Sequence, residues 1–235
     1  MKQEKATAPE LRSGGRLFQT ISPAILPPMT DTTARSPRSF PTSPALWFFI
    51  SLALIAVFSL FGPEEQSLGT GVRIVYLHGV WVWAALLGLG GAAVVGALAL
   101  IVQRDKWHRW SGALARTGLF FWISYIPLSM WAAQVNWNGL FLAEPRWRVA
   151  FVFALGGLVI QVGLRLVENL QISSVLNVFF FGALMYALNQ AQEVMHPASP
   201  IFTSGSLRIQ GFFIGLMLLT TLAAWQLTRW WYGKE

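Results

Sequence analysis

Long apolar runs separated by short polar segments fill the chain from residue 45 onward. Each run approaches or exceeds the roughly 20 residues that an α-helix needs to cross the hydrocarbon core of a bilayer. We therefore predict an all-α fold, a polytopic membrane bundle of about six transmembrane helices. The predicted spans are Ala45–Phe61, Val75–Val102, Ala113–Ala133, Val149–Val167, Ile172–Asn189 and Leu207–Leu227.

Several local signals mark the ends and the packing of these spans. Gly62-Pro63 ends the first span, and the charged run Arg104-Asp105-Lys106 ends the second. The glycines between Gly88 and Gly96 are expected to let neighbouring helices approach closely. Pro127 removes a backbone donor within the third span and is expected to kink it. These features are common in membrane helices and support the span assignment without identifying a function.

Residues 1–44 differ sharply from the rest of the chain. This segment contains seven prolines together with many Ser, Thr and Arg residues, and it has no continuous apolar segment of the kind found in a secretory signal. Such a composition cannot bury a core, so we predict a disordered cytoplasmic tail, with an organelle transit peptide as the less favoured alternative. The expected organisation is a tail over 1–44 and a six-helix transmembrane domain over 45–235.

Composition agrees with a membrane protein. Of the 235 residues, 54% are hydrophobic and 11% are charged, whereas a soluble domain carries about a quarter charged residues. The mean hydropathy is +0.52. The chain has no cysteine, which excludes disulfides, thiolate metal sites and a covalently attached c-type haem.

The net charge of +7 at first suggests a nucleic-acid partner. If the tail is cytoplasmic, however, 13 of the 17 Lys and Arg residues fall on the inner side of the spans and 4 fall on the outer side. This distribution is the one that the positive-inside rule describes, so we expect no nucleic-acid partner and predict both termini in the cytoplasm. A multi-pass protein of the cell's inner membrane, with lipid as its surroundings, is the expected localisation.

Two of the three histidines then lie on the outer side. His78 is at the outer end of the second span and His196 follows the fifth, whereas His108 is placed in an inner loop and is expected to be solvated. Each outer histidine alone is explained by hydrogen bonds to headgroups or water. Together, beside tryptophans and arginines, they suggest two axial ligands for a haem iron, with indoles against the porphyrin and arginines at its propionates.

The residues around these histidines resemble a known family. Arg73-Ile-Val-Tyr-Leu-His78, which follows Gly62-Pro63 and opens a long apolar span, resembles the first histidine motif of the CcmC/CcsA-type cytochrome c assembly proteins. His196 is similar in position to their second external histidine. The stretch Trp137–Arg146 takes the place of their tryptophan-rich loop, although it has fewer tryptophans and carries Glu144 where the family has an aspartate.

The resemblance covers about residues 45–230 and implies a function. A member of this family presents non-covalent haem b on the outer face of the membrane during cytochrome c maturation, together with other maturation proteins. In that interpretation, His78 and His196 bind the iron. The other expected cofactor contacts are Trp137, Arg73, Arg146 and Glu144.

Two other functions remain open. No nucleophile motif, Walker loop or dinucleotide fingerprint is present, so haem handling is favoured over catalysis. A b-haem or quinol-reactive subunit of a respiratory complex is the first alternative, although it would prefer histidines buried within the spans. A secondary transporter is the second alternative, although it would need charged residues near the middle of the membrane.

Overall fold

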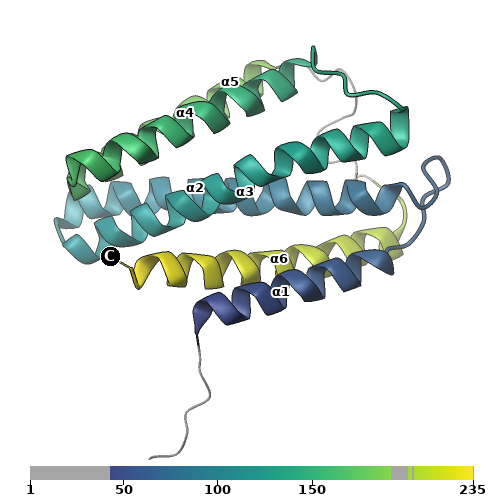
Figure 1. The fold of residues 1–235 in the computed structure, drawn as a ribbon, viewed down its shortest axis with the longest axis horizontal. Coiled ribbons are helices and arrows are strands. Elements are labelled where there is room, and N and C mark those ends of the chain that lie inside the picture. Colours follow the sequence, from purple (N-terminus) through teal and green to yellow (C-terminus); the bar gives the residue numbers. More distant parts are fainter. Residues whose placement is uncertain (1–42, 192–200, 203, 235) are drawn as a thin grey trace, which may run out of the picture. The chain divides into compact units, whose positions relative to one another are not determined.

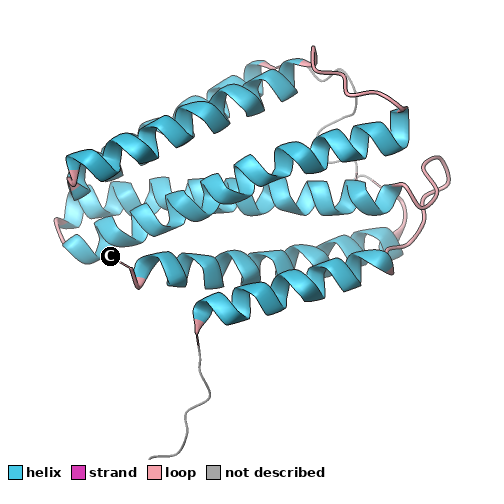
Figure 2. Ribbon diagram, in the orientation of Figure 1, coloured by secondary structure: helices cyan, strands magenta, loops and turns pink. Residues whose placement is uncertain are grey.

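The fold is all-α, as expected. A computed structural model describes residues 43–191, 201–202 and 204–234, and this part of the chain forms helices and no strand (Figures 1 and 2). The predicted disordered tail over 1–44 lies almost wholly outside the described residues. The helices are α1 Pro44–Leu60, α2 Val72–Val102, α3 Asp105–Trp137, α4 Pro145–Val167, α5 Leu170–Gln190 and α6 Leu207–Tyr232.

The lengths of the helices support membrane insertion. The helices α2 to α6 have 21 to 33 residues and are long and apolar enough to cross a bilayer. The remaining helix, α1, is also apolar but has 17 residues, which corresponds to about 25 Å at the rise of an α-helix. It is therefore slightly shorter than the hydrocarbon core, and the chain is a multi-pass membrane protein with five or six spanning helices.

Successive helices run in opposite directions, which gives the bundle two ends. At one end, here called the terminal end, lie the start of α1, the last turn of α6 and the tight turns after α2 and α4 (Figure 1). Gln103 and Glu168 end those two helices with φ of 55° and 50°, a left-handed conformation that lets the chain reverse within two residues. The opposite end, here called the loop end, carries the connections 61–71 and 138–144, the end of α5 and the described residues before α6, 201–202 and 204–206.

The centre of the bundle is α2, which contacts α1, α3, α5 and α6. Its closest approach is to α3, where a Cβ atom on Gly88 would lie 2.7 Å from the Cα atom of Gly118. The prediction of close packing at the Gly88–Gly96 segment is therefore confirmed. On α1, the buried residues Phe48, Ser51, Ile55 and Ser59 follow a helical spacing. They form the face that meets α6.

The prediction for His108 was wrong. The segment assigned to an inner loop is the beginning of α3, which starts at Asp105 rather than at Ala113. His108 is only 2% exposed, and its Nδ1 lies 2.7 Å from the Oγ atom of Ser174 on α5. Since His108, Ser111 and Ala115 share one helical face and all are buried, the histidine belongs to the interior of the bundle.

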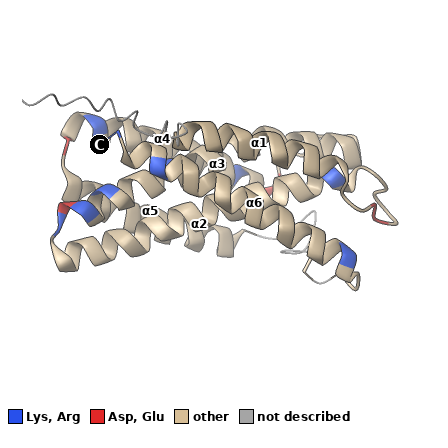
Figure 3. Cartoon of the chain, turned by 90° about the horizontal axis from the view of Figure 1, so that it is seen from below, with Lys and Arg blue, Asp and Glu red and all other residues tan. Residues whose placement is uncertain are grey.

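The basic residues gather mostly toward the two ends of the bundle (Figure 3). Among the described residues, the terminal end has the larger share, as the sequence indicated. It carries Arg104, Lys106, Arg109, Arg116, Arg165, Arg229 and Lys234, whereas the loop end carries Arg73, Arg146, Arg148 and Arg208.

Candidate functional site

A small hollow at the loop end brings together three of the residues expected from the sequence. His78 of α2, Trp137 at the end of α3 and Glu144 at the start of α4 all line it. Its volume is about 50 Å³, which is room for a few water molecules. The other lining residues are Val75, Ser129, Ala132, Ala133, Leu140, Phe141 and Trp147.

The position of His78 follows from the helical spacing of α2. Val75 and His78 are three residues apart, so they share the face that turns toward α3 and the hollow. The imidazole ring lies 5.6 Å, centroid to centroid, from the ring of Tyr125 on α3. One turn further along α2, the indole Nε1 of Trp81 donates to the Oγ atom of Ser124 at 3.1 Å. This hydrogen bond helps to fix the register of α2 and α3 beneath the histidine.

The connection from α3 to α4 forms the wall of the hollow opposite His78. Asn138 ends α3 with φ of 52° and receives a hydrogen bond from the Nε2 atom of Gln134 at 3.0 Å. Phe141 also has a positive φ, of 45°. Glu144 then takes an extended conformation directly before Pro145, the first residue of α4. These reversals bring Trp137, Glu144 and Trp147 to the same hollow.

Trp147 is a member of this site that we did not include among the expected haem contacts. It lines the hollow, and its Nε1 is buried without a hydrogen-bond acceptor among the described residues. The ring stacks on Phe151, with an interplanar angle of 7°. The signal in the sequence was its place three residues after Glu144, which puts both side chains at the first turn of one helix.

Arg73 points away from this hollow. Its Nε donates to the backbone oxygen of Gly62 at 3.1 Å, and its Nη2 lies 3.6 Å from the carboxylate of Glu64. Tyr76, on the same face of α2, donates from its hydroxyl to the backbone oxygen of Pro63 at 3.0 Å. This face of α2 therefore orders the connection from α1, whereas the face that carries His78 turns to α3.

The other arginines at the loop end lie near the start of a helix. Arg146 is half-buried in the first turn of α4, one residue before Trp147, and Arg148 is exposed. Arg208 is exposed in the first turn of α6. Arg146 does not line the hollow, but its neighbour Trp147 does.

The second expected iron ligand, His196, lies outside the described residues. Ile201 and Phe202 are the first described residues after His196. A Cβ atom on Gly79, the neighbour of His78, would lie 4.0 Å from the Cδ1 atom of Ile201. Phe202 makes an edge contact with Trp83 of α2, with ring centroids 6.2 Å apart. The connection between α5 and α6 thus returns to the segment of α2 that carries His78.

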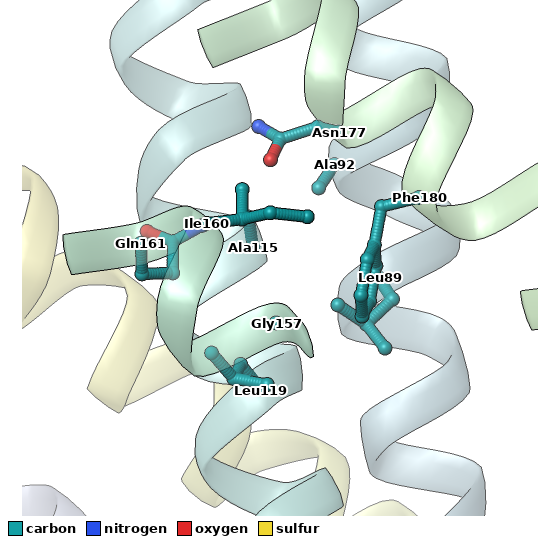
Figure 4. A pocket seen from close by; sticks show the side chains of 9 residues that line it. All are labelled: Leu89, Ala92, Ala115, Leu119, Gly157, Ile160, Gln161, Asn177 and Phe180. Atoms are coloured by element: carbon teal, nitrogen blue, oxygen red, sulfur yellow. The ribbon is translucent and has the colours of Figure 1, made fainter. Parts of the chain in front are cut away.

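A second, smaller cavity lies in the middle of the bundle between α2, α3, α4 and α5. Figure 4 shows the amides of Asn177 and Gln161 among otherwise apolar side chains. The volume of about 10 Å³ is enough for no more than a single water molecule. Asn177 donates to the Oγ atom of Ser111 at 3.0 Å, and Ser111 donates to the backbone oxygen of Ala92 at 2.7 Å. This cavity is part of the packing between the helices and is too small to bind a cofactor.

The chain matches no protein-family model and no curated protein. The case for a function therefore rests on the residues of the loop end and on their geometry.

Proposed function

We propose that this protein binds haem at its loop end and presents it on the outer face of the membrane for cytochrome c assembly. The observation that carries the proposal is the convergence of His78, Trp137, Glu144 and Trp147 on one hollow. They come from three helices, and His78 and Trp137 are 59 positions apart in the chain. The bundle thus brings together the residue types that the sequence suggested for haem.

The chemistry of these side chains suits haem. A bound haem would supply an iron atom that takes an imidazole nitrogen as an axial ligand. His78 offers that imidazole, and Trp137 and Trp147 offer aromatic faces and edges that pack on a porphyrin. The carboxylate of Glu144 can accept a hydrogen bond from an imidazole N–H and so orient a ligating histidine.

The size of the hollow limits how a haem can be held. A porphyrin is many times larger than about 50 Å³, so a haem would not fit inside the hollow and would be held by residues at its mouth. The α3–α4 connection presents the exposed apolar side chains Leu140, Phe141 and Leu142 at this place, and Trp131 is exposed on the last turns of α3. Such an open apolar platform suits a haem that is received and passed on to a partner.

The second proposed ligand is His196, which lies outside the described residues. Ile201 lies against Gly79, next to His78, and follows His196 by five positions in the chain. Five extended residues span at most about 17 Å. His196 therefore remains our proposed second ligand, and it would hold the iron together with His78.

Two of the proposed cofactor contacts have different roles in this arrangement. Arg146 lies beside Trp147 in the first turn of α4, and we propose it as a partner for a haem propionate. Arg73 holds Glu64 and the backbone of Gly62, so its first role is to order the connection between α1 and α2. We place the loop end outside the cell's inner membrane, where other cytochrome c maturation proteins would receive the haem.

The test is the visible absorption spectrum of the purified protein loaded with haem b. His78→Ala and His196→Ala should each abolish the six-coordinate spectrum while the protein stays inserted in the membrane. The double variant should lose little beyond the worse single variant, because the two ligands act as one unit. His108→Asn, which removes an imidazole at the terminal end but keeps a hydrogen-bonding side chain, is the control and should keep the spectrum.

Two outcomes would end this proposal. If the wild-type protein takes up no haem, or if both single variants keep its spectrum, the loop end does not bind haem through these histidines. Haem that is retained by both variants would instead favour the b-haem subunit of a respiratory complex.

A further inference from the structure

The imidazole of His78 packs against the ring of Tyr125 on α3. The two ring centroids are 5.6 Å apart and the ring planes are inclined by 50°. Tyr125 is 7% exposed and lies four residues before Ser129, which lines the hollow at the loop end. Because α3 runs toward the loop end, Tyr125 is one helical turn deeper in the bundle than Ser129. Its ring therefore supports the imidazole from the interior of the bundle.

Tyr125 is in turn held by Trp122, one turn earlier on α3. The two rings meet edge to face, with centroids 5.0 Å apart. The Nε1 atom of Trp122 is buried and donates to the backbone oxygen of Ala150 on α4 at 3.0 Å. The indole cannot turn away without losing this buried hydrogen bond. Ala150 is three residues after Trp147 of the hollow, so a continuous line of contacts joins the α4 wall of the hollow to His78.

A different contact fixes the backbone of α2 at this level. Trp81, three residues after His78, donates from its Nε1 to the Oγ atom of Ser124, the residue before Tyr125. This hydrogen bond limits the sliding of α2 along α3, whereas it does not act on the imidazole ring itself. The ring contact with Tyr125 restricts the rotation of the imidazole about its side-chain bonds.

The orientation of an imidazole matters if it binds an iron. A ligand residue has to be held within about 0.5 Å and 10–20° of its binding geometry, and packing of the side chain supplies this order. An imidazole that turned freely would lose rotamer entropy on binding, which weakens the complex. Residues that orient metal ligands accordingly change metal affinity by roughly 10–100-fold when they are substituted.

We infer that Tyr125 is a positioning residue for His78, an inference that rests on the haem-binding function proposed above. Its ring keeps the imidazole at the hollow in the orientation in which His78 would meet a haem iron. Tyr125 is not part of the lining that the described residues form around the hollow, so it acts through His78 and not by touching haem. Trp122 holds Tyr125 in place.

The experiment compares three variants of the full chain, purified in detergent. Tyr125→Leu removes the ring, and Tyr125→Phe keeps the ring and removes the hydroxyl group. Phe48→Leu is the matched control, because it removes a ring of α1 that is also buried, at 4% exposure, and that contacts Phe49 and Phe120. Each protein is titrated with haem b, its absorption spectrum is recorded, and its melting temperature is measured.

Tyr125→Leu should bind haem b about tenfold more weakly and lose part of the six-coordinate spectrum. Saturating free imidazole should restore that spectrum, because the missing component is an oriented ligand. Tyr125→Phe and Phe48→Leu should bind haem as the wild type does. Wild-type binding by Tyr125→Leu would overturn the inference, and so would an equal loss in Phe48→Leu or in Tyr125→Phe. If Tyr125→Leu does not fold, Tyr125→Met takes its place with the same expected outcomes, since a flexible methionine fills much of the same space.

A second measurement uses the haem-free protein. Diethyl pyrocarbonate modifies imidazoles, and mass spectrometry of the peptides gives the rate at each histidine. Tyr125→Leu should raise the rate at His78 several-fold and leave the buried His108 as slow as in the wild type. An unchanged rate at His78, or an equal rise at His108, would contradict the inference. If the wild type bound no haem, the proposed function would fall, and these rates would still decide whether Tyr125 holds the imidazole.

Discussion

The Nδ1 atom of His108 on α3 lies 2.7 Å from the Oγ atom of Ser174 on α5, and both side chains are almost completely buried. This contact joins two helices whose residues here are 66 positions apart in the chain. One turn further into the bundle, Asn177 and Ser111 repeat the same α5–α3 pairing. The terminal half of the bundle is therefore held by a buried polar seam as well as by apolar packing.

The first prediction concerns this seam. Ser174→Ala should lower the free energy of unfolding by about 1 kcal/mol, because it leaves a buried imidazole nitrogen without its partner. Denaturation in mixed detergent micelles measures the change. Ser173→Ala, at a half-buried position one residue earlier, is the control and should change stability by less. An equal effect of the two substitutions would show that the His108 contact adds nothing.

The second prediction concerns the crossing of α2 and α3. A Cβ atom on Gly118 would lie 2.5 Å from the backbone nitrogen of Leu89, and neither backbone can move away without separating the helices. Gly118→Ala should therefore lower the melting temperature markedly, because overpacking a core costs about 1–3 kcal/mol of the free energy of unfolding. Gly156→Ala on α4, where nothing lies within 4 Å, should leave it unchanged. A Gly118→Ala protein as stable as the wild type would contradict the close approach.

The third prediction concerns orientation. The excess of Lys and Arg at the terminal end, together with that of the tail, should keep this end in the cytoplasm. Reporter fusions after Lys234 and in the turn at Gln103 should report an inner location, and a fusion at Gly205 an outer one. A cytoplasmic reporter at Gly205 would reverse the topology and, with it, the proposed outer haem platform.

The fourth prediction separates two arginines of α4. Arg146→Ala should weaken haem retention without unfolding the protein, because it removes the proposed propionate partner beside Trp147. Arg148→Ala, at an exposed position two residues later, should retain haem as the wild type does. Haem titration followed by absorption gives both affinities. If Arg146→Ala binds haem normally, this arginine is a lipid or loop contact.

The fifth prediction concerns pH and the α1–α2 connection. The hydroxyl and backbone N–H of Ser67 and the N–H of Leu68 donate to the carboxylate of Glu65, and these hydrogen bonds lower the pKa of Glu65 below 4.5. Since the folded pKa is lowered, the stabilisation is complete above pH 4.5 and is lost as the pH falls through the folded value. The protection of the Ser67 and Leu68 amides, measured as the exchange rate relative to the intrinsic rate at each pH, should therefore fall only on acidification below that point. Glu65→Ala, which removes the acceptor, should show low protection of both amides at all pH values.

Much of the fold could be predicted because the bilayer imposes a length on apolar segments. The six predicted spans correspond to the six helices, and most of their ends agree within a few residues. The exception is α3, which begins eight residues before the predicted start at Ala113, in a segment that is mostly polar and aromatic. Hydropathy detects the part of a helix that crosses hydrocarbon, and it misses a turn or two that continue beyond it.

The spacing of residues on α2 also contained a signal that we did not use. Arg73 and His78 are five residues apart, which places them about 140° apart around a helix. The two side chains therefore point to different sides of α2, and both could face one small site only if the arginine side chain extended around the helix. In the structure, Arg73 turns to Gly62 and Glu64, whereas His78 turns to α3.

The sequence by itself determined the class of the protein, the number and approximate positions of its apolar helices and the uneven distribution of basic residues, because these depend on composition and on distance along the chain. Only the tertiary structure decided that His108 is buried against Ser174 and that Trp147 shares a hollow with His78. The spacing of residues fixes the direction of each side chain around its own helix, but the neighbour that it meets depends on how the helices pack. That packing depends on distant contacts, such as the approach of Gly88 to Gly118, which no single segment of the chain contains.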